Sequence, residues 1–234
     1  MRIMVVNPIT TREFESLTKD EFEAAARADV EIEVVSLDEG PPSIESRYEE
    51  ELAARDILRK VERANAEGYD AVIINCFGDP AVGAAREISK IPVVGPGEAS
   101  FLLACCLGQN FSVVTMVDSL VPVVIENLRR LGLSNRLASI RALGIPVLEL
   151  MDRARVKSAL LEISKKAVRE DRAQVIVLGC TGLVGLAAEV QRELGVPVVD
   201  PAIASLKLAE ALVDMKLSPS KAAYAKYSEG AKII

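Results

Sequence analysis

Short apolar runs rich in Val and Ile recur along the chain, each bounded by turn residues. Runs of this kind predict β-strands. We expect strands at residues 3–6, 30–36, 71–75, 93–94, 111–115, 139–142, 175–178 and 198–199. Near-continuous apolar strands such as AVIIN and VIVLG are typical of parallel strands that are buried on both faces.

Longer polar stretches with helical periodicity separate these runs. They predict helices at residues 13–27, 48–67, 80–89, 100–107, 120–131, 152–170, 184–194 and 202–214. Strands that alternate with helices indicate an α/β fold with parallel sheets and helices on both faces. The acidic segment EEELAARD, in the second helix, is most simply a solvated face.

The two halves of the chain resemble each other. AVIINCFGDPAVGAAREISKIPVVGPGEAS in the first half matches QVIVLGCTGLVGLAAEVQRELGVPVVDPAIAS in the second. Cys76 and Cys180 correspond at an offset of 104 (180 − 76), and Pro92 and Pro197 at 105 (197 − 92). Asn7 and Thr115 correspond at the ends of two further strands. Any two strand–helix–strand units look somewhat alike, but shared offsets favour a true repeat.

A true repeat predicts two similar α/β lobes related by a pseudo-twofold. Residues 1–97 and about 206–234 would form the first lobe, with Cys76, and residues 98–205 the second, with Cys180. Each cysteine follows a parallel strand, where ligands bind in open α/β sheets. We therefore expect the two cysteines to face each other across a cleft between the lobes.

Composition excludes several classes of function. The 234 residues include no histidine, which rules out histidine bases and histidine-ligated metal sites. The net charge of −6 and the lack of a basic, aromatic patch argue against nucleic acid as a partner. No apolar run is long enough to span a bilayer, and the N-terminus lacks a signal-peptide cleavage site. We expect a cytoplasmic protein.

Four cysteines are present, and no pair has metal or redox spacing. Cys105 and Cys106 are adjacent in FLLACCLG, and we interpret both as small packed hydrophobes without disulfides. Cys76 and Cys180 each lie at a strand-to-helix turn beside glycine, where a helix N-terminus would lower a thiol pKa. A thiol and a thiolate on opposite faces of one carbon can exchange its proton, which is racemisation or epimerisation.

Other residues near these turns are candidates for substrate binding. Backbone N–H groups around Gly78 and Gly182 could stabilise an enolate oxygen. Asn7 and Thr115 could orient the substrate or bond a local turn. Ser43 could contact substrate, although capping the following helix is the simpler role. Neither GxGxxG nor GxxxxGK[ST] follows a strand, so a nucleotide cofactor is disfavoured.

At these residues the sequence resembles the aspartate/glutamate racemase superfamily, and within it the hydantoin and allantoin racemases. The resemblance covers nearly the whole chain and includes NPITT, GPPSIES, NCFGDPAV, PVVGPGEAS, FSVVT, RALGIPVLEL and LGCTG. It implies two Rossmann-like lobes and cofactor-free proton transfer by Cys76 and Cys180. It also implies substrate contacts from Asn7, Ser43, Ile44, Gly78, Thr115, Thr181 and Gly182.

The chain departs from glutamate racemases at the second cysteine. Those proteins carry a histidine after GCT, whereas this chain has Gly182. Deprotonating a free amino acid builds charge beside a carboxylate and needs strong compensation, but a hydantoin ring is neutral. Neither cysteine motif contains Lys or Arg, which favours the hydantoin.

The sequence thus predicts an isomerase that racemises 5-substituted hydantoins, allantoin included, without cofactor or metal. A racemase or isomerase of a free acid such as aspartate or maleate is the alternative enzyme. A non-catalytic α/β protein that binds a small molecule is the alternative of another class. We expect a small-molecule substrate, no nucleic-acid or membrane partner, and a homo-oligomer.

Overall fold

The computed structural model describes residues 1–225 and contains two four-stranded parallel sheets. Their strand orders, β2-β1-β3-β4 and β6-β5-β7-β8, are equivalent. The strands are β1 (Arg2–Asn7), β2 (Glu31–Ser36), β3 (Ala71–Ile74), β4 (Val93–Val94), β5 (Phe111–Thr115), β6 (Leu137–Ala142), β7 (Ile176–Leu178) and β8 (Val198–Val199). All the expected strands are present, and the predicted α/β fold with two similar lobes is confirmed.

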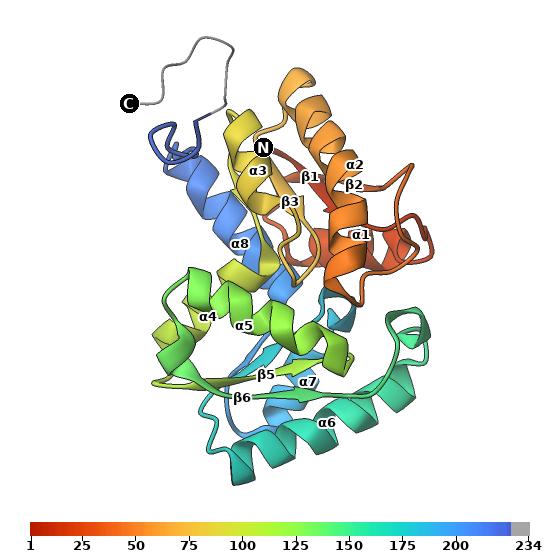
Figure 1. The fold of residues 1–234 in the computed structure, drawn as a ribbon, viewed down its shortest axis with the longest axis vertical. Helices are drawn as coiled ribbons and strands as arrows, with labels where there is room; N and C mark the ends of the chain where they lie inside the picture. Colours follow the sequence, from red (N-terminus) through yellow and green to blue (C-terminus); the bar gives the residue numbers. More distant parts are fainter. Residues whose placement is uncertain (226–234) are drawn as a thin grey trace.

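Eight α-helices cover the sheets of the described chain (Figure 1). They are α1 (Glu15–Ala25), α2 (Arg47–Ala66), α3 (Val82–Ile88), α4 (Pro96–Leu107), α5 (Val121–Arg130), α6 (Arg153–Glu170), α7 (Ala187–Leu194) and α8 (Pro201–Asp214). Two starts differ clearly from the prediction. Helix α4 begins four residues early, at Pro96, because proline suits the first helical turn. Helix α7 begins late, because Thr181–Leu183 form a 3₁₀ turn, η4.

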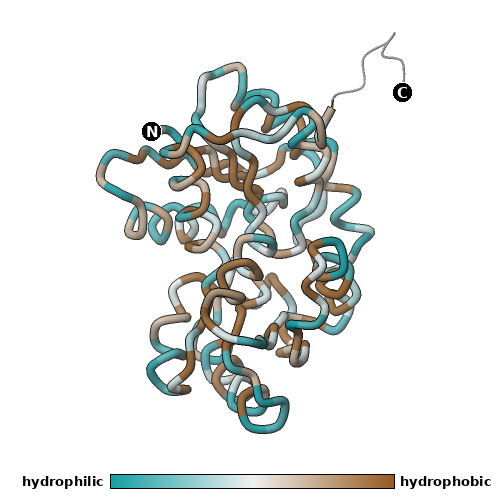
Figure 2. The backbone as a smooth tube through the Cα atoms, turned by 90° about the vertical axis from the view of Figure 1, so that its left-hand side faces the viewer, coloured by the Kyte–Doolittle hydropathy of each residue, from teal (hydrophilic) through white to brown (hydrophobic). Residues whose placement is uncertain are grey.

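Alternate residues of each central strand enter different cores. In β1, Met4 and Val6 pack with α2 residues, while Ile3 and Val5 pack toward α1 and α8. The apolar cluster that contains Ile3 and Val5 continues across the lobe boundary to Phe101 of α4 and to residues of β5 and β7. Figure 2 shows these strands as brown segments inside both lobes. The two lobes therefore share one apolar core.

Helices α4 and α8 each cross from one lobe to the other. Helix α4 follows β4 of the first sheet but contacts β7 and β8 of the second, and α8 follows β8 but contacts β3 and β4. The two helices also pack against each other, and α8 lies beside the first-lobe elements in Figure 1. The two sheets define the two lobes. The lobe boundaries at residues 97 and 206 stay predictions, and residues 226–234 lie outside the described residues.

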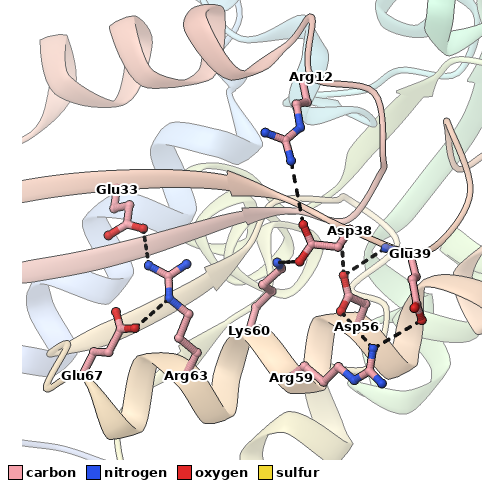
Figure 3. Close-up of polar contacts among 9 residues, drawn as sticks. All are labelled: Arg12, Glu33, Asp38, Glu39, Asp56, Arg59, Lys60, Arg63 and Glu67. Carbon is pink, nitrogen blue, oxygen red and sulfur yellow. Dashed lines mark hydrogen bonds and ion pairs between the residues drawn. The ribbon is translucent and has the colours of Figure 1, made fainter.

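Helix α2 is fastened to the first sheet by ion pairs (Figure 3). Lys60 pairs with Asp38 at 2.5 Å, and Arg63 pairs with Glu33 of β2 at 2.6 Å. The Asp56 carboxylate is buried and accepts the Asp38 backbone N–H at 2.7 Å. Glu50 is also buried, so the prediction that EEELAARD is a solvated face is wrong for Glu50 and Asp56.

No described helix has both the length and the apolar content that a membrane crossing requires.

The loop after β3 is anchored to the start of α4. Asp79, in the left-handed region at φ 55°, accepts the backbone N–H groups of Gly97 at 2.8 Å and Glu98 at 2.7 Å. A Cβ on Gly97 would lie 2.3 Å from the Phe77 carbonyl, so only glycine permits this approach. Burial raises the pKa of Asp79 to about 7, although these two N–H groups oppose the shift. One buried carboxyl thus ties the Cys76 turn to the crossing helix.

We predict that Asp79→Ala lowers the free energy of unfolding by about 2–3 kcal/mol, through loss of the cap and strain at a left-handed position. Asp79→Asn, which tolerates this backbone and retains one acceptor, should lose less. Urea denaturation measures both effects. The matched control is Asp20→Ala, at an exposed position of α1, which should change the free energy of unfolding by less than about 0.5 kcal/mol. Equal effects at both positions would contradict the anchoring role.

Candidate active site

One cavity lies where the carboxyl ends of the two sheets meet, and Cys76 and Cys180 both line it. The predicted site residues Asn7, Ile44, Gly78, Thr115, Thr181 and Gly182 also line it. Ser43 is buried but is not part of the wall. The structure therefore brings together both cysteines and all the expected binding residues except Ser43.

The two cysteine turns contact each other across the lobe boundary. The Thr181 hydroxyl donates to the Asn75 carbonyl at 3.0 Å, and both atoms are buried. The Gly78 N–H favours the thiolate of Cys76, and the N–H groups of Gly182 and Leu183 favour that of Cys180. The two cysteines occupy equivalent places after β3 and β7.

The thiols do not have the lowered pKa that the sequence predicts. Burial raises the pKa of Cys180 to about 11, and burial followed by the charge of Glu50 raises the pKa of Cys76 well above its usual value. Cys76 also lies six residues before Val82, the first residue of α3, and therefore gains nothing from that helix terminus. The loss of hydration destabilises each thiolate by more than one or two backbone N–H groups stabilise it.

Asparagine side chains form the polar wall of the cavity. Asn75 Nδ2 donates to Asn7 Oδ1 at 2.8 Å, and Asn7 Nδ2 donates to Thr18 Oγ1 at 3.4 Å. This arrangement leaves Asn75 Oδ1 buried without a hydrogen-bond partner among the described residues. A buried acceptor without a partner is costly. Asn75 and Thr18 were missed as site residues, although Asn75 directly precedes Cys76.

Two other predicted residues have local roles. The Thr115 hydroxyl donates to the Gly179 carbonyl at 3.5 Å, which ties the end of β5 to the Cys180 turn. Ser46, not Ser43, caps α2, and its hydroxyl accepts the Glu49 N–H. The simpler role given to Ser43 is wrong, because α2 begins at Arg47, too far along the chain. Glu49 completes the cap by accepting the Glu45 N–H at 2.6 Å.

Most of the cavity wall is apolar, which the sequence did not reveal. The apolar residues come from several loops and helices of both lobes; they are Pro8, Ile9, Phe14, Leu17, Ile44, Phe77, Leu120, Val123, Val124, Val147, Leu150 and Val184. No charged side chain belongs to the wall as formed by the described residues. Apart from Ile44, which the family resemblance implies, these positions resemble ordinary core residues in sequence, so only the fold reveals them.

The remaining cysteines lie elsewhere. All four cysteines are free. Cys105 is partly buried against the shared core, but Cys106 is exposed, so the prediction of a packed thiol is wrong for Cys106. Within residues 1–225, no group of three His, Cys, Asp or Glu residues is placed to hold a metal ion.

The chain is similar in sequence and fold to known racemases. The family model described as Asp/Glu/Hydantoin racemase matches residues 3–209. A hydantoin racemase from Pseudomonas sp. (strain NS671) is 38% identical over 230 residues, which cover 98% of this chain and 92% of the relative. The structure of an allantoin racemase from Klebsiella pneumoniae is similar with a TM-score of 0.94 and 33% identity, covering 99% and 96% of the two chains. For an allantoin racemase from Pseudomonas fluorescens, the TM-score is 0.92 and the identity 37%, with full coverage of both.

Proposed function

The chain belongs to the Asp/Glu/hydantoin racemase family, and on this basis we propose that it racemises 5-substituted hydantoins with two cysteines and no cofactor. Membership confirms the predicted isomerase over the non-catalytic binding protein. The observation that carries the finer proposal is the cavity itself. Two thiols from opposite lobes share it, and its described wall has no charged side chain.

The proposed reaction needs only the two sulfurs. The thiolate of one cysteine removes the proton from C5 of the ring, and the electron pair of the C–H bond moves onto the neighbouring carbonyl oxygen as an enolate. The thiol of the other cysteine then gives its proton to the opposite face of C5. The thiolate and the thiol have exchanged places after one turnover, so the reverse reaction uses the same groups.

The polar wall suits a neutral ring better than a free amino acid. A hydantoin ring is neutral and offers N–H donors, and the polar side chains of the wall, among them Asn7, Thr115 and Thr181, are neutral as well. A substrate carboxylate would instead meet an apolar wall without a cation. The same wall favours an apolar substituent on C5 over the polar ureido group of allantoin.

The cytoplasmic location and the homo-oligomer stay predictions.

We predict that a hydantoin with an apolar 5-substituent has a kcat/KM at least about tenfold above that of allantoin, the difference expected when an apolar wall must desolvate a polar group. Free aspartate and glutamate should show no turnover. The assay is exchange of the C5 or α hydrogen in deuterated water, followed by NMR. Turnover of a free amino acid at a comparable rate would favour the acidic-substrate racemase instead.

We predict that Cys76→Ser and Cys180→Ser each lower racemisation by at least about 10³-fold, because a serine hydroxyl is a far weaker acid and its alkoxide is not formed near neutral pH. Circular dichroism of one pure enantiomer follows the reaction. Cys105→Ser and Cys106→Ser are the matched controls outside the cavity, and both should keep nearly full activity. Full racemisation by either cavity variant would rule out the two-cysteine reaction.

We predict that kcat/KM rises about tenfold per pH unit from pH 7 toward pH 10. The base must be a thiolate, and the pKa of Cys180 is raised to about 11. A larger fraction of the enzyme carries the thiolate as the pH increases. The pH profile is measured after subtraction of the reaction without enzyme. A plateau that begins below pH 8 would show that the thiol pKa is low.

A further inference from the structure

The two lobes place opposite charges behind their cysteine turns. Helices α2 and α6 occupy equivalent positions, since each connects the first edge strand of its sheet to the strand that precedes the cysteine. The first turn of α2 carries Glu50, and α6 begins at Arg153. Glu50 faces the Cys76 turn and Arg153 faces the Cys180 turn, as the contacts below show.

Glu50 is pressed against the turn that holds Cys76. Its side chain is only 2% exposed, and its Oε1 lies 1.8 Å from where a Cβ on Gly78 would be. That oxygen has no hydrogen-bond partner among the described residues, while Oε2 accepts from Arg47 at 2.6 Å. The Gly78 N–H also favours the Cys76 thiolate, whereas the charge of Glu50 disfavours it. The carboxyl group therefore lies against the turn that carries this thiol.

Arg153 has the equivalent place behind Cys180. Its guanidinium donates to the carbonyls of Gly182 at 2.8 Å and Val184 at 2.5 Å. The N–H of Gly182, the counterpart of Gly78, is one of the two that favour the Cys180 thiolate. A Cβ on Gly182 would meet Leu150, an apolar side chain, rather than a carboxylate. Arg153 thus holds the second turn and brings positive charge to it.

The other groups near each thiol also differ between the two turns. Besides Glu50, the negative charges of Asp79 and of an ionised Cys180 raise the pKa of Cys76, and only the Gly78 N–H lowers it. Arg47, Glu51, Glu126 and Asp79 in turn act on Glu50. For Cys180, burial and the charge of Glu45 raise the pKa, while the N–H groups of Gly182 and Leu183 and the positive charge of Arg153 lower it; Glu21 and Asp200 act on Arg153. A positive charge thus favours a thiolate at Cys180, and the charges that act on Cys76 are all negative.

We infer that Glu50 and Arg153 are positioning residues that make the two cysteines unequal, so that Cys180 is the base and Cys76 the acid before substrate binds. The inference rests on the proposed two-cysteine reaction. Proton abstraction then starts at Cys180, and the proton delivered to the opposite face comes from Cys76. The next turnover requires the proton to return to Cys76.

Glu50 also makes this inequality depend on pH. Burial raises the pKa of Glu50 to about 7, although Arg47 opposes the shift. Below pH 7 the carboxyl is neutral and does not affect Cys76. Above pH 7 it is charged and suppresses ionisation of Cys76. Replacing Glu50 with glutamine should therefore matter in alkaline solution and not in acid.

The test is the alkylation rate of each thiol by iodoacetamide, with no substrate present. Arg86 and Arg172 place Cys76 and Cys180 on separate tryptic peptides, which mass spectrometry resolves. At pH 9, Glu50→Gln should speed Cys76 alkylation by about three- to tenfold, because removal of the negative charge lowers the pKa of Cys76. At pH 6 the variant and the wild type should react alike, and Cys180 should change little at either pH.

Glu51→Gln is the matched control, since it removes the same charge from the neighbouring, exposed position. It should leave Cys76 alkylation unchanged. An equal effect of Glu51→Gln, an unchanged Cys76 rate in Glu50→Gln, or the same change at pH 6 and pH 9 would each overturn the inference. In racemisation, Glu50→Gln should alter the kcat/KM profile above pH 7 only.

Arg153 gives a second, independent arm if Glu50→Gln fails to fold. Arg153→Met should slow Cys180 alkylation at pH 9 by about threefold or more, and Arg153→Lys, which keeps the charge, should restore most of the rate. If Cys180 reacted equally fast in Arg153→Met and Arg153→Lys, the charge of Arg153 would have no effect and the inference would be wrong. Alkylation needs no turnover, so an enzyme that racemises nothing, yet shows these rates, would refute only the proposed function.

Discussion

Removal of water from two thiols is the constraint on which this site depends. Cys76 and Cys180 share one largely apolar cavity, and burial is the main cause of the raised pKa of both. A high pKa makes each thiolate scarce but also makes it a strong base, which suits the removal of a weakly acidic proton from carbon. The same cavity disfavours a charged substrate, because a charged ligand would lose its hydration there just as a thiolate does.

The rest of the fold keeps these two turns in place. Asp79 joins the Cys76 turn to the start of α4, and Asp200 joins the start of α8 to Gly185, beyond the Cys180 turn. Both helices cross to the opposite lobe and pack against each other. Each cysteine turn is therefore linked to a helix that supports the other sheet, and the lobes share an apolar core. Such a connection holds the sulfurs at a fixed spacing.

Equivalent topology does not make the halves equivalent in charge. Gly78 and Gly182 correspond in the repeat, yet a carboxylate lies behind the first and a guanidinium behind the second. Reversible proton transfer needs one thiolate and one thiol, so a symmetric site would have to populate both arrangements equally. In our proposal, the opposite charges on α2 and α6 favour one of them, and neither Glu50 nor Arg153 belongs to the cavity wall, which stays neutral.

The sequence by itself determined the strands, the helices, the α/β class and the correspondence of Cys76 with Cys180, because these follow from local periodicity and from repetition. It also located most of the site, since residues at the ends of parallel strands meet at one sheet edge. It could not determine the pKa of either thiol. Nor could it show that Glu50 is buried, because the polar segment EEELAARD is typical of a solvated face. Nor could it distinguish Phe14, Val147 or Leu150 from core residues, or show that Ser46 rather than Ser43 caps α2. These properties depend on which distant segments exclude water from a group, and only the packed tertiary structure decides that.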